Sequence, residues 1–339
     1  MPVAAVPFPP MEAELVRELP EGDGWQYEPK WDGFRGVLEN AAGELALWSR
    51  NGRPLLRYFP ELRPLGELLP PVSALDGEIV IVRDGVLDFD AMQMRLHPAE
   101  SRVRRLAAEI PAELVVFDML VWGGEEVWRL PLEQRRARVE ALRGFRLSPA
   151  TRSAAEARGW LARFESLGLD GVVAKRLGAP YLPGSRDGVV KVKEHKSADC
   201  VVVGIRFKKE PADVATLLLG LYAEDGRLDY VGTCAVAARS RAEVAARVLP
   251  LVDPSSERRF SEPNRWGSGD LEQAALRPEL VVEVRYDKVQ GNRFRHGTKL
   301  LRWREDKRPE DCTWRELRPP AAAAPAGVEA LFAAGHGSP

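Results

Sequence analysis

The chain has 339 residues, of which 45% are hydrophobic and 29% are charged, as in an ordinary folded protein. At about 100–200 residues per domain, this length predicts two domains. Its 49 basic and 50 acidic side chains give a net charge of -1, which excludes binding to nucleic acid or to an anionic membrane by overall charge alone.

The cysteines, the apolar runs and the N-terminus exclude further classes. Cys200, Cys234 and Cys312 lie far apart, so the sequence predicts neither a disulfide framework nor a four-cysteine zinc site. No apolar run approaches the roughly 18 residues that cross a bilayer, and the proline-rich start lacks the basic segment of a signal peptide. We therefore expect a cytoplasmic protein that makes no contact with a membrane.

The first part of the chain, residues 1–197, is predicted to be a mixed α/β domain. Two alternating runs flank an Ala-Gly turn, which is typical of a hairpin, and two apolar runs have strand length: Phe34–Glu39, Glu44–Trp48, Leu75–Val82 and Glu113–Val121. Helices are predicted over Leu132–Arg143 and Ser153–Gly168, and Ser153 with Glu156 has the spacing of a capping box.

The second part, residues 198–318, is predicted to be a small β-barrel. Three short strands precede a helix and two more strands follow it: Val201–Phe207, Thr216–Tyr222, Leu228–Ala235, helix Arg241–Leu249, then Leu280–Tyr286 and Thr298–Trp303. This order is that of an OB-fold barrel, which commonly binds nucleic acid. A second capping box is predicted at Ser240 and Glu243. Residues 319–339 are rich in Ala, Pro and Gly and are predicted to be a disordered tail.

The run Lys30-Trp31-Asp32-Gly33 is the first candidate for chemistry. A lysine becomes a nucleophile when burial or neighbouring charges favour its neutral form. The same residues are also typical of an ordinary β-turn with a solvated lysine, and this short pattern by itself does not separate the two interpretations.

Further segments follow in a fixed order, and several place charge where an isolated charge is costly. They are Ser49-Arg50-Asn51-Gly52, Leu75-Asp76-Gly77-Glu78, Phe117-Asp118, Asp170-Gly171-Val172-Val173-Ala174-Lys175 and Lys191-Val192-Lys193. Glu78 and Asp118 fall in apolar strands, where a carboxylate needs a partner. Lys191 and Lys193 face one side of a strand, which a bound polyanion such as a triphosphate would stabilise.

In that order the segments resemble motifs I, Ia, III, IIIa, IV and V of the covalent nucleotidyltransferase superfamily, most closely the ATP-dependent DNA ligases. The run Arg302-Trp303-Arg304-Glu305-Asp306-Lys307 looks like motif VI. The likeness spans Trp25 to Leu317 and is greatest to the minimal bacterial LigC-like type. It implies an α+β chain, with an ATP-grasp-like nucleotidyltransferase (adenylation) domain followed by a small OB-fold β-barrel.

The resemblance implies that ATP is the cofactor and that Lys30 attacks its α-phosphate to form lysyl-AMP. AMP then passes to the 5′-phosphate of a nick in duplex DNA, and the 3′-hydroxyl displaces it, a reaction suited to DNA repair. The ATP-binding residues implied are Glu28, Arg35, Arg50, Glu78, Phe117, Lys191, Lys193, Arg304 and Lys307. Glu78 and Asp170 are implied ligands of Mg²⁺ or Mn²⁺. Motif IV usually begins with Glu, so Asp170 shortens the reach of that carboxylate.

Each of these residues also has an ordinary interpretation. Phe117 in an apolar strand is typical of a core residue, Glu78 of a structural ion pair, and Arg50 of a solvated loop. The order of the motifs, rather than any single residue, favours the ligase interpretation.

A local excess of positive charge predicts the DNA contact. Between Tyr286 and Arg308 eight residues are basic and three are acidic. Arg293, Arg295, Lys299 and Arg302, interleaved with aromatic residues, are therefore predicted to bind DNA phosphates. The alternative is an ordinary solvated strand face.

Two other functions stay open on the sequence. An RNA ligase or a GTP-dependent capping-type enzyme shares motifs I, III, IV and V. An inactive OB-containing nucleic-acid-binding protein would keep the fold without the chemistry, although the presence of Lys30, Glu78, Lys191 and Lys193 counts against it. We expect a monomer that acts on nicked double-stranded DNA.

Overall fold

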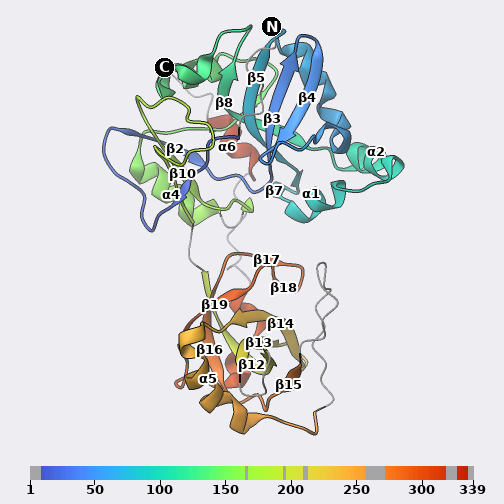
Figure 1. Ribbon diagram of the computed structural model, residues 1–339, viewed down its shortest axis with the longest axis vertical. Coiled ribbons are helices and arrows are strands. Elements are labelled where there is room, and N and C mark those ends of the chain that lie inside the picture. Colours follow the sequence, from blue (N-terminus) through green and yellow to red (C-terminus); the bar gives the residue numbers. More distant parts are fainter. Residues whose placement is uncertain are drawn as a thin grey trace. The chain divides into compact units, whose positions relative to one another are not determined.

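The computed structural model describes residues 9–164, 167–193, 196–208, 213–256, 272–317 and 327–334. The chain divides into two compact units (Figure 1). Unit 1 comprises Met1–Glu194 together with Ala321–Pro339, and unit 2 comprises His195–Pro320. Among the helices of the described residues, none has the length and apolar character needed to cross a membrane.

The larger sheet of unit 1 has the strand order β4-β3-β5-β8-β9. Its strands are β3 (Phe34–Ala41), β4 (Glu44–Ser49), β5 (Ser73–Val80), β8 (Glu113–Val121) and β9 (Arg146–Leu147). Ala42 and Gly43 join β3 to β4 with φ of 55° and 105°, the backbone that a tight two-residue hairpin turn requires. The predicted hairpin and the two predicted apolar strands are therefore confirmed.

The smaller sheet of unit 1 has the order β1-β11-β10-β2. Its strands are β1 (Glu14–Leu15), β2 (Trp25–Pro29), β10 (Val172–Arg176) and β11 (Val189–Val192). β10 pairs antiparallel with both β2 and β11, so motif I after the end of β2, motif IV at β10 and motif V at the end of β11 lie next to one another. A two-stranded ribbon, β6 (Val82–Arg83) with β7 (Val86–Leu87), follows β5.

A shared core joins the two sheets of unit 1. Val80 and Val115 of the larger sheet pack in one buried cluster with Tyr27, Val172 and Ala174 of the smaller sheet. Helix α4 (Ala154–Phe164) packs on β2 and β10, and α3 (Leu132–Glu140) packs on β8. Helices α1 (Phe89–Arg95) and α2 (Glu100–Glu109) follow the ribbon. Ser153 Oγ accepts a hydrogen bond from Glu156 N at 3.2 Å, which is one half of the predicted capping box. The other half differs, because Ser153 N donates to Thr151 Oγ1 and the Glu156 carboxylate accepts from Thr151 Oγ1 at 2.6 Å.

The prediction that residues 319–339 are disordered is wrong for their described part. Residues 327–334 form a turn followed by helix α6 (Glu329–Ala334), which packs on unit 1. Val328 and Phe332 are buried, and Leu331 packs beside them. These three apolar side chains recur at helical spacing, a signal that the Ala- and Pro-rich composition of the whole segment hides. The rest of the predicted tail lies outside the described residues.

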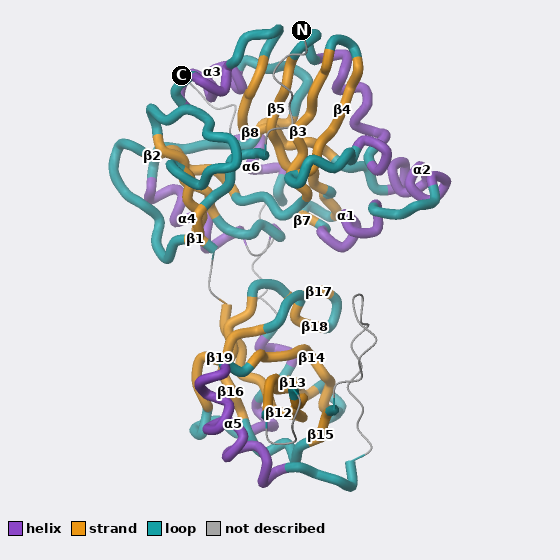
Figure 2. The backbone as a smooth tube through the Cα atoms, viewed as in Figure 1, coloured by secondary structure: helices purple, strands orange, loops and turns teal. Residues whose placement is uncertain are grey.

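Unit 2 is a closed barrel with the topology predicted for an OB-fold. The strands are β12 (Lys196–Phe207), β13 (Val214–Tyr222), β14 (Leu228–Ala235), β15 (Gln273–Ala275), β16 (Val281–Tyr286) and β19 (Thr298–Trp303). The order β13-β14-β19-β16-β12 closes through an additional β12–β13 pairing, and β14 runs parallel to β19. These strands are orange in Figure 2. β17 (Val289–Gln290) and β18 (Arg293–Phe294) form a separate hairpin.

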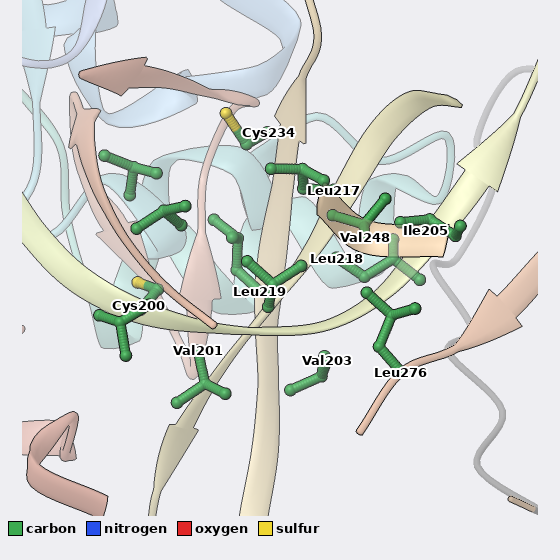
Figure 3. Packing of buried hydrophobic residues seen from close by; sticks show 14 of the residues in the cluster. Cys200, Val201, Val203, Ile205, Leu217, Leu218, Leu219, Cys234, Val248 and Leu276 are labelled. Atoms are coloured by element: carbon green, nitrogen blue, oxygen red, sulfur yellow. The ribbon is translucent and has the colours of Figure 1, made fainter. Parts of the chain in front are cut away.

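Buried apolar side chains from the strands and from α5 (Arg241–Val248) fill the barrel. Figure 3 shows side chains from β12, β13 and β14 together with Val248 of α5. The three cysteines are free thiols in this core. The second predicted capping box is wrong, because Ser240 ends a preceding 3-10 turn and caps α5 without a side-chain hydrogen bond. Its φ of -104° and ψ of -2° differ from the extended backbone of a capping residue.

Candidate active site

A cavity of about 760 Å³ in unit 1 contains most of the motif residues. It is lined from both sheets and from the N-terminal segment, and it is large enough for a nucleotide. Seven of the predicted ATP-site residues line it: Glu28, Lys30, Arg35, Arg50, Glu78, Phe117 and Lys191.

Lys30 follows strand β2 and is fixed by its backbone to motif IV. Its N–H donates to the Gly171 carbonyl at 2.8 Å, and its own carbonyl accepts from Asp170 N at 2.9 Å. Gly171 has φ of +135°, and a Cβ there would lie 2.1 Å from the Val192 carbonyl oxygen, so only glycine fits. The Lys30 ammonium, 22% exposed, lies 2.6 Å from Asp170 Oδ2. This is not the freely solvated lysine of an ordinary turn.

Asp170 also contacts the second lysine of motif V. Lys193 Nζ lies 2.7 Å from the same Oδ2 atom, so one carboxylate joins Lys30 to Lys193. Burial opposes ionisation of Asp170, but Lys30 and Lys193 outweigh it and hold the pKa of this carboxyl below its usual range. For Lys191, burial and then the charges of Lys30 and Lys193 lower the pKa of the amine. Lys30 and Lys191 line the cavity, whereas Lys193 and Asp170 are not among its lining residues, and Lys193 is joined to Lys30 through Asp170.

Glu78 of β5, the other predicted metal ligand, also lines the cavity. Burial raises the pKa of its carboxyl to about 7, against the opposing influence of Lys30 and Arg35. One carboxylate oxygen accepts a hydrogen bond from Gly33 N at 3.2 Å. A Cβ on Gly33 would lie 2.0 Å from the Ile79 carbonyl oxygen, so glycine lets the Lys30 loop approach β5 this closely. Both predicted metal ligands are thus carboxylates within the electrostatic reach of Lys30.

Phe117 presents an aromatic face to the cavity. The Phe117 side chain is only partly buried, unlike that of a core residue. Two cations lie over its ring, with Arg35 Cζ 4.6 Å and Lys175 Nζ 4.7 Å from the ring centroid. Lys175 also forms a buried ion pair with Glu28 at 2.8 Å. Glu28 is therefore held by Lys175 beside the aromatic ring.

Arg35 and Arg50 are held by carboxylates that the motif analysis did not assign. Arg35 makes a bidentate pair with buried Asp76, with contacts of 2.6 and 2.5 Å. Arg50 pairs with Glu12 of the N-terminal segment, and Glu12 also accepts from Arg186 at 3.0 Å. The hydrogen bonds from Arg186 and Arg50 hold the pKa of the Glu12 carboxyl below its usual range. Arg50 is thus an exposed loop residue at the cavity wall, with a side chain that is 59% exposed and paired with Glu12.

Sequence reasoning missed the group of buried charges that supports Phe117. Arg135 of α3 makes a bidentate pair with Asp118 at 2.8 and 3.1 Å, and both side chains are nearly inaccessible. Arg135 also donates to the carbonyls of Leu130 and Ala179. Tyr181 donates to Asp76 at 2.7 Å. The one available signal was a carboxylate in an apolar strand, which predicts a partner but does not identify it.

Arg304 and Lys307 of the predicted motif VI lie in unit 2. Both contact Asp199 Oδ2, at 2.6 and 3.0 Å. Arg304 also pairs with Asp306, and Lys307 also pairs with Glu316. Hydrogen bonds from the Arg304 guanidinium lower the pKa of Asp306 to about 2. Within unit 2, therefore, Asp199 joins the two cations of motif VI.

The four predicted DNA-binding residues lie on β18, β19 and the segment between them. Arg293 lies over the Tyr230 ring at 5.0 Å, Arg295 is partly buried, and Lys299 and Arg302 are exposed. Arg302 pairs with Glu283 at 2.6 Å. Acidic residues outside the counted stretch therefore offset part of the charge excess that the sequence shows.

Comparison with known proteins decides the family. The family described as ATP dependent DNA ligase domain matches residues 2–193, and the ATP dependent DNA ligase C terminal region matches residues 210–307. This chain belongs to the ATP-dependent DNA ligase family. It is 44% identical over 331 residues to DNA ligase C1 of Mycolicibacterium smegmatis, covering 93% of this chain and 94% of the relative. It is 41% identical to DNA ligase C of Mycobacterium tuberculosis, and this match covers 93% of this chain and 94% of the relative.

A solved structure of mycobacterial DNA ligase D complexed with ATP and MES is 27% identical, with a TM-score of 0.50. The match covers 90% of this chain and 98% of that one. Together the matches confirm the predicted LigC-like type, the two-domain fold, the use of ATP and the DNA ligase class. They do not favour an RNA ligase, a capping enzyme or an inactive binding protein.

Proposed function

We propose that this ATP-dependent DNA ligase seals nicks through a covalent AMP adduct on Lys30. The observation that carries the proposal is the position of this amine in the cavity, 2.6 Å from Asp170 and within the field of Lys191 and Lys193. An amine nucleophile beside a concentration of positive charge suits attack on a phosphorus atom whose oxygens gain negative charge.

The reaction is three exchanges at phosphorus. The lone pair of Lys30 Nζ forms an N–P bond to the α-phosphate of ATP while the P–O bond to pyrophosphate breaks. An oxygen of the 5′-phosphate at the nick then attacks the same phosphorus and releases Lys30. Finally the 3′-hydroxyl oxygen bonds to the 5′-phosphate and AMP leaves. Catalysis rests on positioning and charge neutralisation, and we assign the neutralisation to Lys191 and Lys193.

The aromatic wall and the buried pair beside it form the proposed base site. Phe117 stacks on adenine, with Glu28 held against its edge by Lys175. Arg35 and Arg50 contact the ribose and phosphate side of the nucleotide, each oriented by its carboxylate partner.

Glu78 and Asp170 are the residues that would hold Mg²⁺ or Mn²⁺. Their hard oxygen atoms fit such an ion, which takes one or two protein carboxylates and completes its shell with phosphate and water. The described residues contain no group of three or more acidic, histidine or cysteine side chains that could hold a metal ion. When bound, the ion would neutralise charge on the phosphates.

In unit 2 we propose that Arg304 and Lys307 bind the leaving pyrophosphate. Both are held by Asp199, so a phosphate group competes with this carboxylate for the same cations. Arg293, Arg295, Lys299 and Arg302 are proposed to contact the backbone of nicked duplex DNA, which makes binding salt-sensitive. We further propose a cytoplasmic monomer that acts in DNA repair; the free thiols in the barrel core fit a reducing compartment.

The test is adduct formation with labelled nucleotide. We expect ATP, and not GTP, to label the protein, and Lys30→Ala to abolish the adduct while nicked-duplex binding stays unchanged. Lys196→Ala, a lysine of β12 in unit 2, is the control and should keep the adduct. An adduct that survives Lys30→Ala removes Lys30 from the nucleophile role, and labelling by GTP alone contradicts the ATP assignment. The rates of sealing of a nicked DNA duplex and of a nicked RNA–DNA hybrid then show whether the enzyme joins DNA or RNA strands.

A further inference from the structure

The C-terminal helix α6 contacts the residue that follows the proposed nucleophile. The ring of Phe332 stacks on the indole of Trp31, with centroids 5.2 Å apart and planes 8° from parallel. Phe332 is 7% exposed and Trp31 is 5% exposed. A segment some 300 positions later in the chain than Lys30 therefore packs directly on the loop that carries Lys30.

Contacts at its start show that α6 is docked at a defined place. Val328 N donates to the Gly85 carbonyl at 2.7 Å. A Cβ on Gly327 would lie 2.8 Å from Gly85 Cα, so the backbones touch where both residues are glycine. Both also have positive φ, 53° and 76°. This close approach needs glycine on each side.

A third contact fixes the helix on the larger sheet. Arg146 of β9 pairs with Glu329 at 3.0 Å, and its guanidinium carbon lies 4.4 Å from the centroid of the Phe332 ring. Val328 and Phe332 belong to the core cluster that joins the two sheets of unit 1. The helix is thus held by a backbone hydrogen bond, an ion pair and buried apolar area together.

Trp31 connects this docking to the nucleophile. Its indole N–H donates to Ser148 Oγ at 3.0 Å, and Phe332 packs against its face. Lys30 itself is fixed by the backbone bonds to Gly171 and Asp170. Without the Phe332 ring, the Trp31 side chain loses packing on one face, and the Lys30 backbone beside it gains freedom to move. None of the residues lining the cavity comes from α6.

We propose that residues 327–334 are a positioning element for Lys30, acting through the stacking of Phe332 on Trp31. The proposal rests on the proposed role of Lys30. It assigns to Phe332 an effect on the rate of AMP transfer to the lysine rather than on ATP binding. Helix α6 does not line the cavity, and Trp31, which does, lies beside Lys30 and outside the proposed base, ribose and metal contacts.

The experiment compares two partial reactions in the full-length Phe332→Ala protein. The first is single-turnover transfer of AMP from ATP to the enzyme over a range of ATP concentrations. The second is sealing of a nicked duplex that already carries 5′-AMP, in which Lys30 is not the nucleophile. We expect the first rate constant to fall about tenfold to a hundredfold, the loss that a misplaced reacting group brings. The half-saturating ATP concentration and the second reaction should be unchanged.

Two further variants complete the test. Ala330→Gln changes an exposed residue of the same helix and should leave both reactions unchanged. Phe332→Leu keeps apolar volume without a ring face and should give an intermediate loss; it also decides the question if Phe332→Ala does not fold. Equal losses in both reactions, or no loss in the first, overturn the proposal. Failure of the unaltered protein to form any adduct instead contradicts the proposed function.

Discussion

The buried ion pair between Arg135 and Asp118 gives the most stringent test of the structure. The two side chains are 3% and 4% exposed, and the pair is bidentate. Arg135→Met preserves length and apolar volume but leaves Asp118 buried with a backbone N–H of Met119 as a remaining hydrogen-bond donor. It also removes the donors that satisfy the carbonyls of Leu130 and Ala179.

Breaking a buried pair by removing one partner costs about 3–5 kcal/mol in free energy of unfolding. In a unit of this size, 1 kcal/mol shifts the melting temperature by about 2–4 °C, so a 4 kcal/mol loss corresponds to about 8–16 °C. The measurement is thermal and denaturant unfolding of the full-length variant, followed by the fluorescence of its tryptophans.

Arg138→Met is a matched control on the same helix. Arg138 pairs with Glu125, but these side chains are 35% and 55% exposed. Such an exposed pair contributes about 0–1 kcal/mol. If Arg135→Met lowers the free energy of unfolding no more than Arg138→Met does, the Arg135–Asp118 pair does not stabilise the protein as described. Because Asp118 follows Phe117, Arg135→Met is also expected to weaken ATP binding, whereas Arg138→Met should not.

Two further outcomes follow from the charges of the cavity. The pKa of Glu78 is about 7, above its ordinary value of 4.5, so its contribution to stability is fully present below pH 4.5 and is lost as the pH rises through 7. In the presence of a chelator, the free energy of unfolding of Glu78→Gln should therefore match that of the unaltered protein near pH 4.5. Above pH 7 it should exceed it by about 3 kcal/mol, at about 1.4 kcal/mol per pKa unit. A difference in unfolding free energy that stays constant across this pH range contradicts the burial of the Glu78 carboxyl. Lys175→Met leaves Glu28 buried without its cation and should raise the KM for ATP about tenfold or more. Arg158→Met, at an exposed residue of α4 that does not line the cavity, should not, and equal effects of the two would remove Lys175 from the base site.

Local patterns predicted those parts of the fold that depend on neighbouring residues. The β3–β4 hairpin follows from alternation around Ala42-Gly43, and the barrel order follows from short strands around one helix. The Ser153 cap was predicted correctly and the Ser240 cap was not, although both have the same spacing. The difference is the 3-10 turn before Ser240, which fixes its backbone away from the capping conformation.

Helix α6 shows why composition averaged over a segment is an unreliable guide. Residues 319–339 contain few side chains that can be buried, and the average predicts disorder. Three apolar residues at helical spacing are nevertheless enough when a complementary surface exists, here Trp31 and Gly85. That surface is made by the first part of the chain, so the spacing of the three apolar residues indicates a helix but not the surface on which it packs.

The motifs identified which residues gather at the site but not how they are held. Lys30, Glu78, Phe117 and Lys191 were predicted from their order along the chain, and the fold brings them to one cavity. The partners that hold the predicted site residues come from segments distant in sequence. Lys175 holds Glu28, and Glu12 holds Arg50. Such pairings depend on strand register, because a shift of one residue in β10 would turn Lys175 away from Glu28. Short motifs therefore predict which residues carry the chemistry of the site, whereas the pairing of β2, β10 and β11 sets its geometry.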